Sequence, residues 1–244
     1  MTVVNIVAQG ALTCCRRFSV LRAVPLITLL LFLGPVAAGL IGTLLPAFGF
    51  LPALGGEVLS WVPLRSLLEA PGLTDSIRLS FVTGLATTVV SLTVVILFCA
   101  GWHGTRGFAK VQRLLSPLLS VPHVTVALGL AFLLAPSGWL LRLVSPWATG
   151  VARPPDAIIV QDPAGLTLIT GLMIKEIPFL FLMTLAAIGQ VDAARTRTMA
   201  RILGYGPVAA WLKAVFPQVY PQIRLPVFAV LAYAVSVVDV AIVL

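Results

Sequence analysis

Residues 79–100 read LSFVTGLATTVVSLTVVILFCA, and this run contains no charged side chain. A helix needs roughly 20 mostly apolar residues to cross the hydrocarbon core of a bilayer, so the run is long enough to span one. Four further runs of this kind lie at Ala23–Phe50, Leu114–Pro136, Gly165–Gly189 and Leu225–Leu244. The sequence therefore predicts five membrane spans.

The composition of the whole chain supports this interpretation. Apolar residues make up 59% of the 244 residues and charged residues only 10%, whereas roughly a quarter of a soluble domain is charged. Backbone groups in lipid must be satisfied within the segment, and the runs are continuous rather than alternating, so helices are expected instead of a β-barrel. The predicted fold class is an all-α, polytopic membrane helix bundle.

Basic residues alternate between the predicted loops, as the positive-inside rule requires of cytoplasmic segments. The basic loops hold Arg16, Arg17 and Arg22, then Arg106, Lys110 and Arg113, then Arg195, Arg197, Arg201, Lys213 and Arg224, while the others hold only Arg65, Arg78, Arg142 and Arg153. We therefore expect a cytoplasmic N-terminus in a bacterial-type inner membrane. The net charge of +8 is assigned to these loops, and nucleic acid is not expected as a partner.

The loop at residues 190–223 reads QVDAARTRTMARILGYGPVAAWLKAVFPQVYPQI. Its Ala-rich first half favours a helix, which Gly204 is expected to end. Pro207 suits the first turn of a second, short helix, predicted over Val208–Val215. Two later prolines, at 217 and 221, are expected to end that helix. A basic, partly apolar element of this kind suits either a soluble partner or an anionic lipid surface.

The spacing in this loop resembles the signature of binding-protein-dependent ABC importer permeases of type I. That pattern is Glu-Ala-Ala, three residues, Gly, and a Pro thirteen residues after the Gly. Thr198 stands in place of the acid and Met199 in place of the first Ala, so the chain resembles a divergent member. A register that starts at Asp192 fits less well, because it lies six residues too far from the Gly. The resemblance assigns ATPase coupling to Thr198, Met199, Ala200, Gly204, Tyr205, Pro207 and Pro217.

The resemblance extends over residues 75–244, which are expected to form the permease core. Lys175-Glu176-Ile177-Pro178-Phe179 resembles the Lys-x-x-Pro-Phe stretch of the fourth span. Residues 1–74 would supply a cytoplasmic segment, the first span and an external loop. A sixth span normally follows in this family, so we expect the natural chain to continue beyond Leu244.

Inward transport of a small solute by alternating access is what the resemblance implies. The chain contains no Gly-rich Lys-Ser/Thr phosphate loop, so ATP would bind to a separate cytoplasmic subunit, and this chain would hold no cofactor and be no enzyme. The implied partners are that ATPase, an extracytoplasmic substrate-binding protein, the bilayer and a second permease unit, as a homodimer, a partner chain or a fused half. Thiamine-like compounds, ferric iron and small oxyanions are the candidate solutes.

Three ionisable residues lie inside predicted spans, where such groups are costly and usually face a cavity or a partner. Lys175, Glu176 and Asp239 are interpreted as lining a translocation path or as making polar contacts between helices. The same residues would form the charge relay of an ion-coupled secondary transporter, which is the alternative function. An intramembrane enzyme using Glu176 or His123 in acid-base chemistry is a third hypothesis, but no nucleophile–base pair at a suitable spacing supports it. No other residue lies at metal-ligand spacing from His123.

Overall fold

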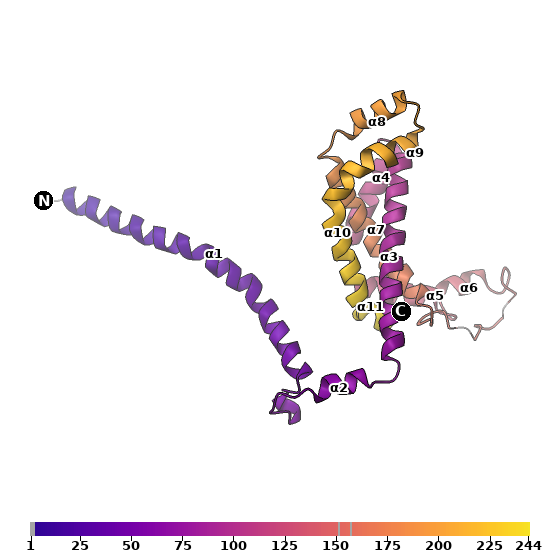
Figure 1. The fold of residues 1–244 in the computed structure, drawn as a ribbon, viewed down its shortest axis with the longest axis horizontal. Coiled ribbons are helices and arrows are strands. Elements are labelled where there is room, and N and C mark those ends of the chain that lie inside the picture. Colours follow the sequence, from indigo (N-terminus) through magenta and orange to yellow (C-terminus); the bar gives the residue numbers. More distant parts are fainter. Residues whose placement is uncertain (1–2, 151, 157) are drawn as a thin grey trace. The chain divides into compact units, whose positions relative to one another are not determined.

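The computed structural model describes residues 3–150, 152–156 and 158–244, with side chains from residue 23 onward. The arginines predicted to precede the first span therefore have side chains outside the described part. The chain divides into two compact units, Met1–Leu73 and Thr74–Leu244, and each is described by itself (Figure 1).

The first unit consists mainly of the long helix α1 (Val3–Ala47), followed by the 3-10 turn η1 (Pro52–Leu54) and the short helix α2 (Val62–Leu68). Its segment Ala23–Ala47 is long and apolar enough to cross a membrane, as predicted. Nearly all described side chains of this segment are exposed, which suits a helix surrounded by lipid. After the helix, Phe48 and Trp61 meet edge to face with ring centroids 5.2 Å apart.

The second unit is a bundle in which α3, α7 and α10 run alongside one another, with α8 at one end (Figure 1). The described residues form no strand apart from one isolated bridge in the first unit, and five helices are long and apolar enough to span a membrane, so the predicted fold class is confirmed. The elements are α3 (Leu73–Trp102), α4 (Arg106–Leu115), η2 (Ser116–Ser120), α5 (His123–Leu134), α6 (Trp139–Val144), α7 (Leu166–Ile188), α8 (Ala193–Ile202), α9 (Pro207–Ala210), η3 (Trp211–Val215), α10 (Phe216–Ser236) and α11 (Asp239–Val243).

The third predicted span is not the single helix expected over Leu114–Pro136. A 3-10 turn, η2, follows α4, and the chain is extended at Val121 before α5 begins. Pro117 and Pro122 explain the break, because each proline lacks an N–H and restricts the backbone of the residue before it. The membrane-length segment is His123–Val144 instead.

The fifth span also differs from its prediction. Pro217 and Pro221 do not end a short helix: helical structure continues from Pro207 to Ser236 as one membrane-length segment. Pro217 lies in the first turn of α10, where a missing N–H costs little, and the π-helical turn η3 immediately before it absorbs the change in hydrogen bonding. The predicted helix Leu225–Leu244 breaks near its end instead, because Val237 is extended and α11 starts at Asp239.

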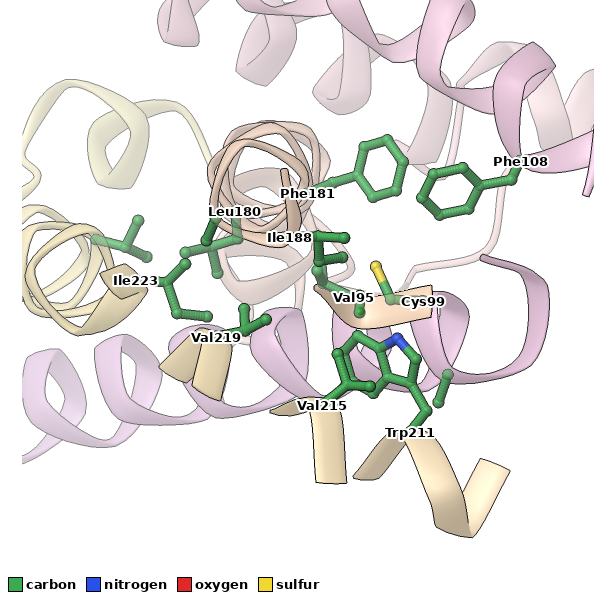
Figure 2. Close-up of a cluster of buried hydrophobic side chains, with 14 residues drawn as sticks. Val95, Cys99, Phe108, Leu180, Phe181, Ile188, Trp211, Val215, Val219 and Ile223 are labelled. Carbon is green, nitrogen blue, oxygen red and sulfur yellow. The ribbon is translucent and has the colours of Figure 1, made fainter. Parts of the chain in front are cut away.

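The largest buried cluster of the second unit joins α3, α4, α7, α8, η3 and α10 (Figure 2). Side chains spaced four residues apart lie on one face of η3 and α10, and together they form a buried seam. On α3 and α7 the seam meets Val95, Leu180 and their neighbours. The ring of Phe181 on α7 meets Phe108 on α4 with centroids 5.2 Å apart, so α4 is tied to the same core. The four seam residues are Trp211, Val215, Val219 and Ile223.

A close approach between α3 and α10 occurs at Gly84. A Cβ placed there would lie 2.6 Å from Val235 Cγ2 and 3.0 Å from the Val235 backbone nitrogen. Small residues let membrane helices pack backbone to backbone in this way. Because the obstacle is partly backbone, a side chain at Gly84 would force the two helices apart.

We therefore expect Gly84→Ala to lower the free energy of unfolding by about 1–3 kcal/mol, the usual cost of overpacking. Gly101→Ala is the matched control, because it lies in the same helix and a Cβ there meets nothing within 4 Å. Thermal unfolding in detergent, followed by size-exclusion chromatography, compares the two variants. Equal loss of folded protein from both would contradict the close approach.

Candidate functional site

The segment predicted as a loop over 190–223 begins with α8, and both ends of this helix are capped. The Asp192 side chain caps the start of the helix by accepting from the Arg195 N–H at 3.2 Å. At the other end, Gly204 has φ +88°, and the N–H groups of Gly204 and Tyr205 donate to the carbonyls of Arg201 and Ala200. This pair of bonds is a Schellman motif. The predicted end of the helix at Gly204 is confirmed.

The predicted coupling residues do not all face the same way. Ala200 is buried, whereas Thr198, Met199 and Tyr205 are exposed. The Thr198 hydroxyl donates to the carbonyl of Ala194 one turn earlier, so its proton is used within the helix. Pro207 begins α9 and is exposed, and Pro217 lies in the first turn of α10.

Large apolar side chains are exposed at the end of α8, in the turn after it and on α9. Ile202 and Leu203 are 80% and 77% exposed, which is unusual for large aliphatic residues beside charged ones. Sequence analysis singled out Met199 and Tyr205 but missed the others, although apolar residues at spacings of three and four on a polar helix are a recognisable signal. We call this set the α8 patch: Met199, Ile202, Leu203, Tyr205 and Val208.

Polar contacts hold the α8 element against the rest of the unit. The Arg197 guanidinium donates to the carbonyl of His103, just beyond the end of α3, at 3.1 Å. Burial and then the Arg197 charge lower the pKa of His103, so both favour the neutral imidazole. Across the turn, Lys213 Nζ lies over the Tyr205 ring, 5.2 Å from its centroid. These contacts connect α8 to both α3 and η3.

Gly204→Ala should loosen the end of α8. The left-handed backbone costs a residue with a Cβ about 1–2 kcal/mol, and no neighbour lies within 4 Å to add a steric term. Gly206→Ala is the control, since that site is equally open but has φ −63°. We expect faster amide hydrogen exchange at residues 199–205 in Gly204→Ala only. Unchanged exchange would contradict the assigned role of this glycine.

The intramembrane residues Lys175 and Glu176 are adjacent in sequence but differ in their hydrogen bonding. The Lys175 Nζ donates to the carbonyls of Leu118, Leu119 and Val121 at 2.6, 3.1 and 2.6 Å. Those carbonyls lie where η2 ends and have lost their helical partners. The ammonium of Lys175 on α7 thereby satisfies the carbonyls between η2 and α5, although these residues lie 54–57 positions away in sequence.

Glu176 is the opposite case. It is 3% exposed, and both carboxyl oxygens lack a hydrogen-bond partner of acceptable geometry, as does the nearby Ser91 hydroxyl. It lines a cavity of about 370 Å³ together with Lys175, His123 and Tyr233. The exposed Asp239 starts α11 after the helix break, rather than lying mid-helix as predicted.

His123 lies at the start of α5, and its ring is 4.8 Å from that of Tyr233 on α10. Among the described residues, no group of three or more His, Cys, Asp or Glu is placed to hold a metal ion. The site therefore brings together one satisfied ammonium, one unsatisfied carboxyl group and two rings.

Lys175→Met should destabilise the second unit by about 2–4 kcal/mol, because it leaves three part-buried carbonyls without this donor. Lys213→Met removes an ammonium from an exposed position and should cost far less. The measurement is the midpoint of thermal unfolding in detergent. If both variants unfold at the same temperature, the bonds to η2 do not hold the broken span.

Comparison with known proteins gives one informative match. The chain is 29% identical over 187 residues to the inner membrane ABC transporter permease protein YnjC of Escherichia coli K12. The match covers 76% of this chain and 34% of the relative, so the chain spans about a third of the length of the relative. No family model matches. This similarity and the five membrane-length helices confirm the predicted resemblance to an ABC transporter permease, in a divergent form.

Proposed function

We propose that this chain is the transmembrane permease subunit of an ABC importer in a bacterial-type inner membrane, with its N-terminus in the cytoplasm. It moves a small solute inward by alternating access when a separate subunit hydrolyses ATP. The similarity to a permease supports the transporter class, and the alternation of basic loops supports the orientation.

The observation that carries the proposal is the α8 patch. Large apolar side chains stay exposed on an element held rigidly by the Gly204 turn and the Arg197 bond. Exposed apolar groups rimmed by polar residues mark interaction surfaces. We assign this surface to the cleft of the ATPase subunit.

Thr198 stands where the family pattern has an acidic residue, so the contact between α8 and the ATPase would need other polar groups. Helix α8 has the sequence AARTRTMARI, with three arginines and no acid. Arg195 and Arg201 are exposed on it, so we expect polar contacts to acidic residues of the ATPase. Electrostatic complementarity of this kind sets association rate and partner choice.

A continuous route connects the patch to the spans. The turn after α8 leads directly into α9, η3 and α10, and the seam of η3 and α10 packs against α3 and α7. A displacement of α8 by the ATPase is thereby passed to three packed helices. Packed interfaces shift between discrete arrangements rather than deform gradually, which suits two-state alternating access.

Further partners complete the assembly. An extracytoplasmic substrate-binding protein would deliver the solute, and a second permease unit would form the other half of the pathway, as a homodimer, a partner chain or a fused half. A secondary transporter with a Lys175–Glu176–Asp239 relay has less support, because the protons of Lys175 go to backbone carbonyls.

Leu203→Glu should abolish co-purification of the ATPase subunit with the tagged permease from native membranes. A charge in an apolar contact costs several kcal/mol unless it is paired, and Leu203 is largely solvent-exposed before binding, so the fold should persist. The control is Leu54→Glu, which changes an equally exposed leucine of the first unit.

Two quantities are measured. The first is the amount of the ATPase subunit, identified by its Walker A motif, that is retained with the permease. The second is the rate at which the retained protein hydrolyses ATP. Equal retention by Leu203→Glu and the control would remove the α8 patch from the proposal. Solute uptake that persists in ATP-depleted vesicles under a proton gradient would favour the secondary transporter.

A further inference from the structure

We propose that the cavity between α5, α7 and α10 binds the transported solute as an organic cation, with the Glu176 carboxylate as its counter-charge. This inference rests on the proposed permease function and adds the charge and chemical class of the solute.

The cavity has a volume of about 370 Å³ and lies between elements that break inside the bundle. The turn η2 and the extended Val121 separate α4 from α5 beside it, and Tyr233 lies one turn before the break between α10 and α11. Discontinuous helices commonly form solute and ion sites in transporters, since their open ends point into the protein. Its lining residues are Leu119, His123, Lys175, Glu176, Phe179, Ala229, Val230 and Tyr233.

Glu176 supplies the signal for a ligand. A buried polar group normally has a partner, and an isolated carboxylate in a low-dielectric region is costly. Here both oxygens are buried without one. A cation in the cavity would satisfy the carboxylate and neutralise its charge.

Lys175 also lines the cavity, but its hydrogen-bonding capacity is used. Its ammonium donates to three carbonyls where η2 ends, and an ammonium has three protons to give. Carbonyls at a helix end carry partial negative charge, so they offset the lysine charge locally. Among the residues that line the cavity, Glu176 has buried side-chain oxygens without a hydrogen-bond partner.

The remaining lining favours an organic cation over a hydrated metal ion. Phe179, Tyr233 and His123 supply aromatic faces, and Tyr233 and His123 are in contact. Ammonium groups bind to such faces by cation–π attraction, most strongly where water is excluded. Leu119, Ala229 and Val230 would contact the apolar part of the solute.

The test uses the full chain in nanodiscs of neutral phosphatidylcholine, so that anionic lipid does not retain cations. Equilibrium dialysis measures binding of radiolabelled benzyltrimethylammonium, its neutral analogue neopentylbenzene and the anion benzenesulfonate. We expect saturable binding of the cation alone. Glu176→Gln should weaken it by about tenfold or more, because it removes one partner of a buried charge pair.

Glu69→Gln is the matched control, since it changes an exposed acid of the first unit that pairs with Arg65, and it should bind as the parent does. Phe179→Leu keeps an apolar side chain but removes a ring, so it should weaken cation binding by about threefold to tenfold. If Glu176→Gln does not fold, Phe179→Leu tests the proposed cation site by itself.

Unchanged cation affinity in both cavity variants, or no saturable binding, would overturn the proposal. Preferential binding of benzenesulfonate would also overturn it, and would assign the cavity to an anion at the start of α5. Co-purification of the ATPase is measured in parallel with Glu176→Gln. If the ATPase co-purifies with both the parent chain and Glu176→Gln while the parent shows no saturable cation binding, the solute assignment alone is wrong and the proposed function stands.

Discussion

The three hydrogen bonds from Lys175 to the carbonyls of Leu118, Leu119 and Val121 are the contact on which the second unit depends. Backbone carbonyls inside a bilayer have no water to bind, so a broken helix persists only where the protein supplies donors. Helix α7 supplies them from a single ammonium. This contact stabilises the chain where η2 ends and α5 begins, beside the cavity.

The apolar seam of η3 and α10 has a complementary role. Trp211, Val215 and Val219 are almost fully buried against α3 and α7. They follow α9, which itself follows the turn after α8. The exposed α8 patch and the buried seam are thus successive parts of one chain segment. This continuity gives the exposed element a mechanical connection to the spans, which a flexible loop would not provide.

Charge distribution separates the two ends of the second unit. Helix α8 carries three arginines and no acid, while the cavity between α5 and α10 contains a carboxyl group without a partner. A basic surface recruits an acidic partner, and an unsatisfied acid in an apolar cavity favours a cationic solute. The two proposed contacts, to the ATPase and to the solute, thus rely on opposite charges at different places in the second unit.

Span number, the all-α class and the helix end at Gly204 followed from the sequence, because run length and a left-handed glycine act locally. The resemblance in residues 190–217 followed as well. Sequence could not show that helical structure continues through Pro217 and Pro221 but stops at Pro117 and Pro122. The π-helical turn before Pro217 and the Lys175 ammonium beside η2 are features of the folded chain. Nor could adjacency in sequence show that Lys175 is satisfied and Glu176 is not. The carbonyls that Lys175 binds lie in and just after η2, and only tertiary packing brings them within reach of α7.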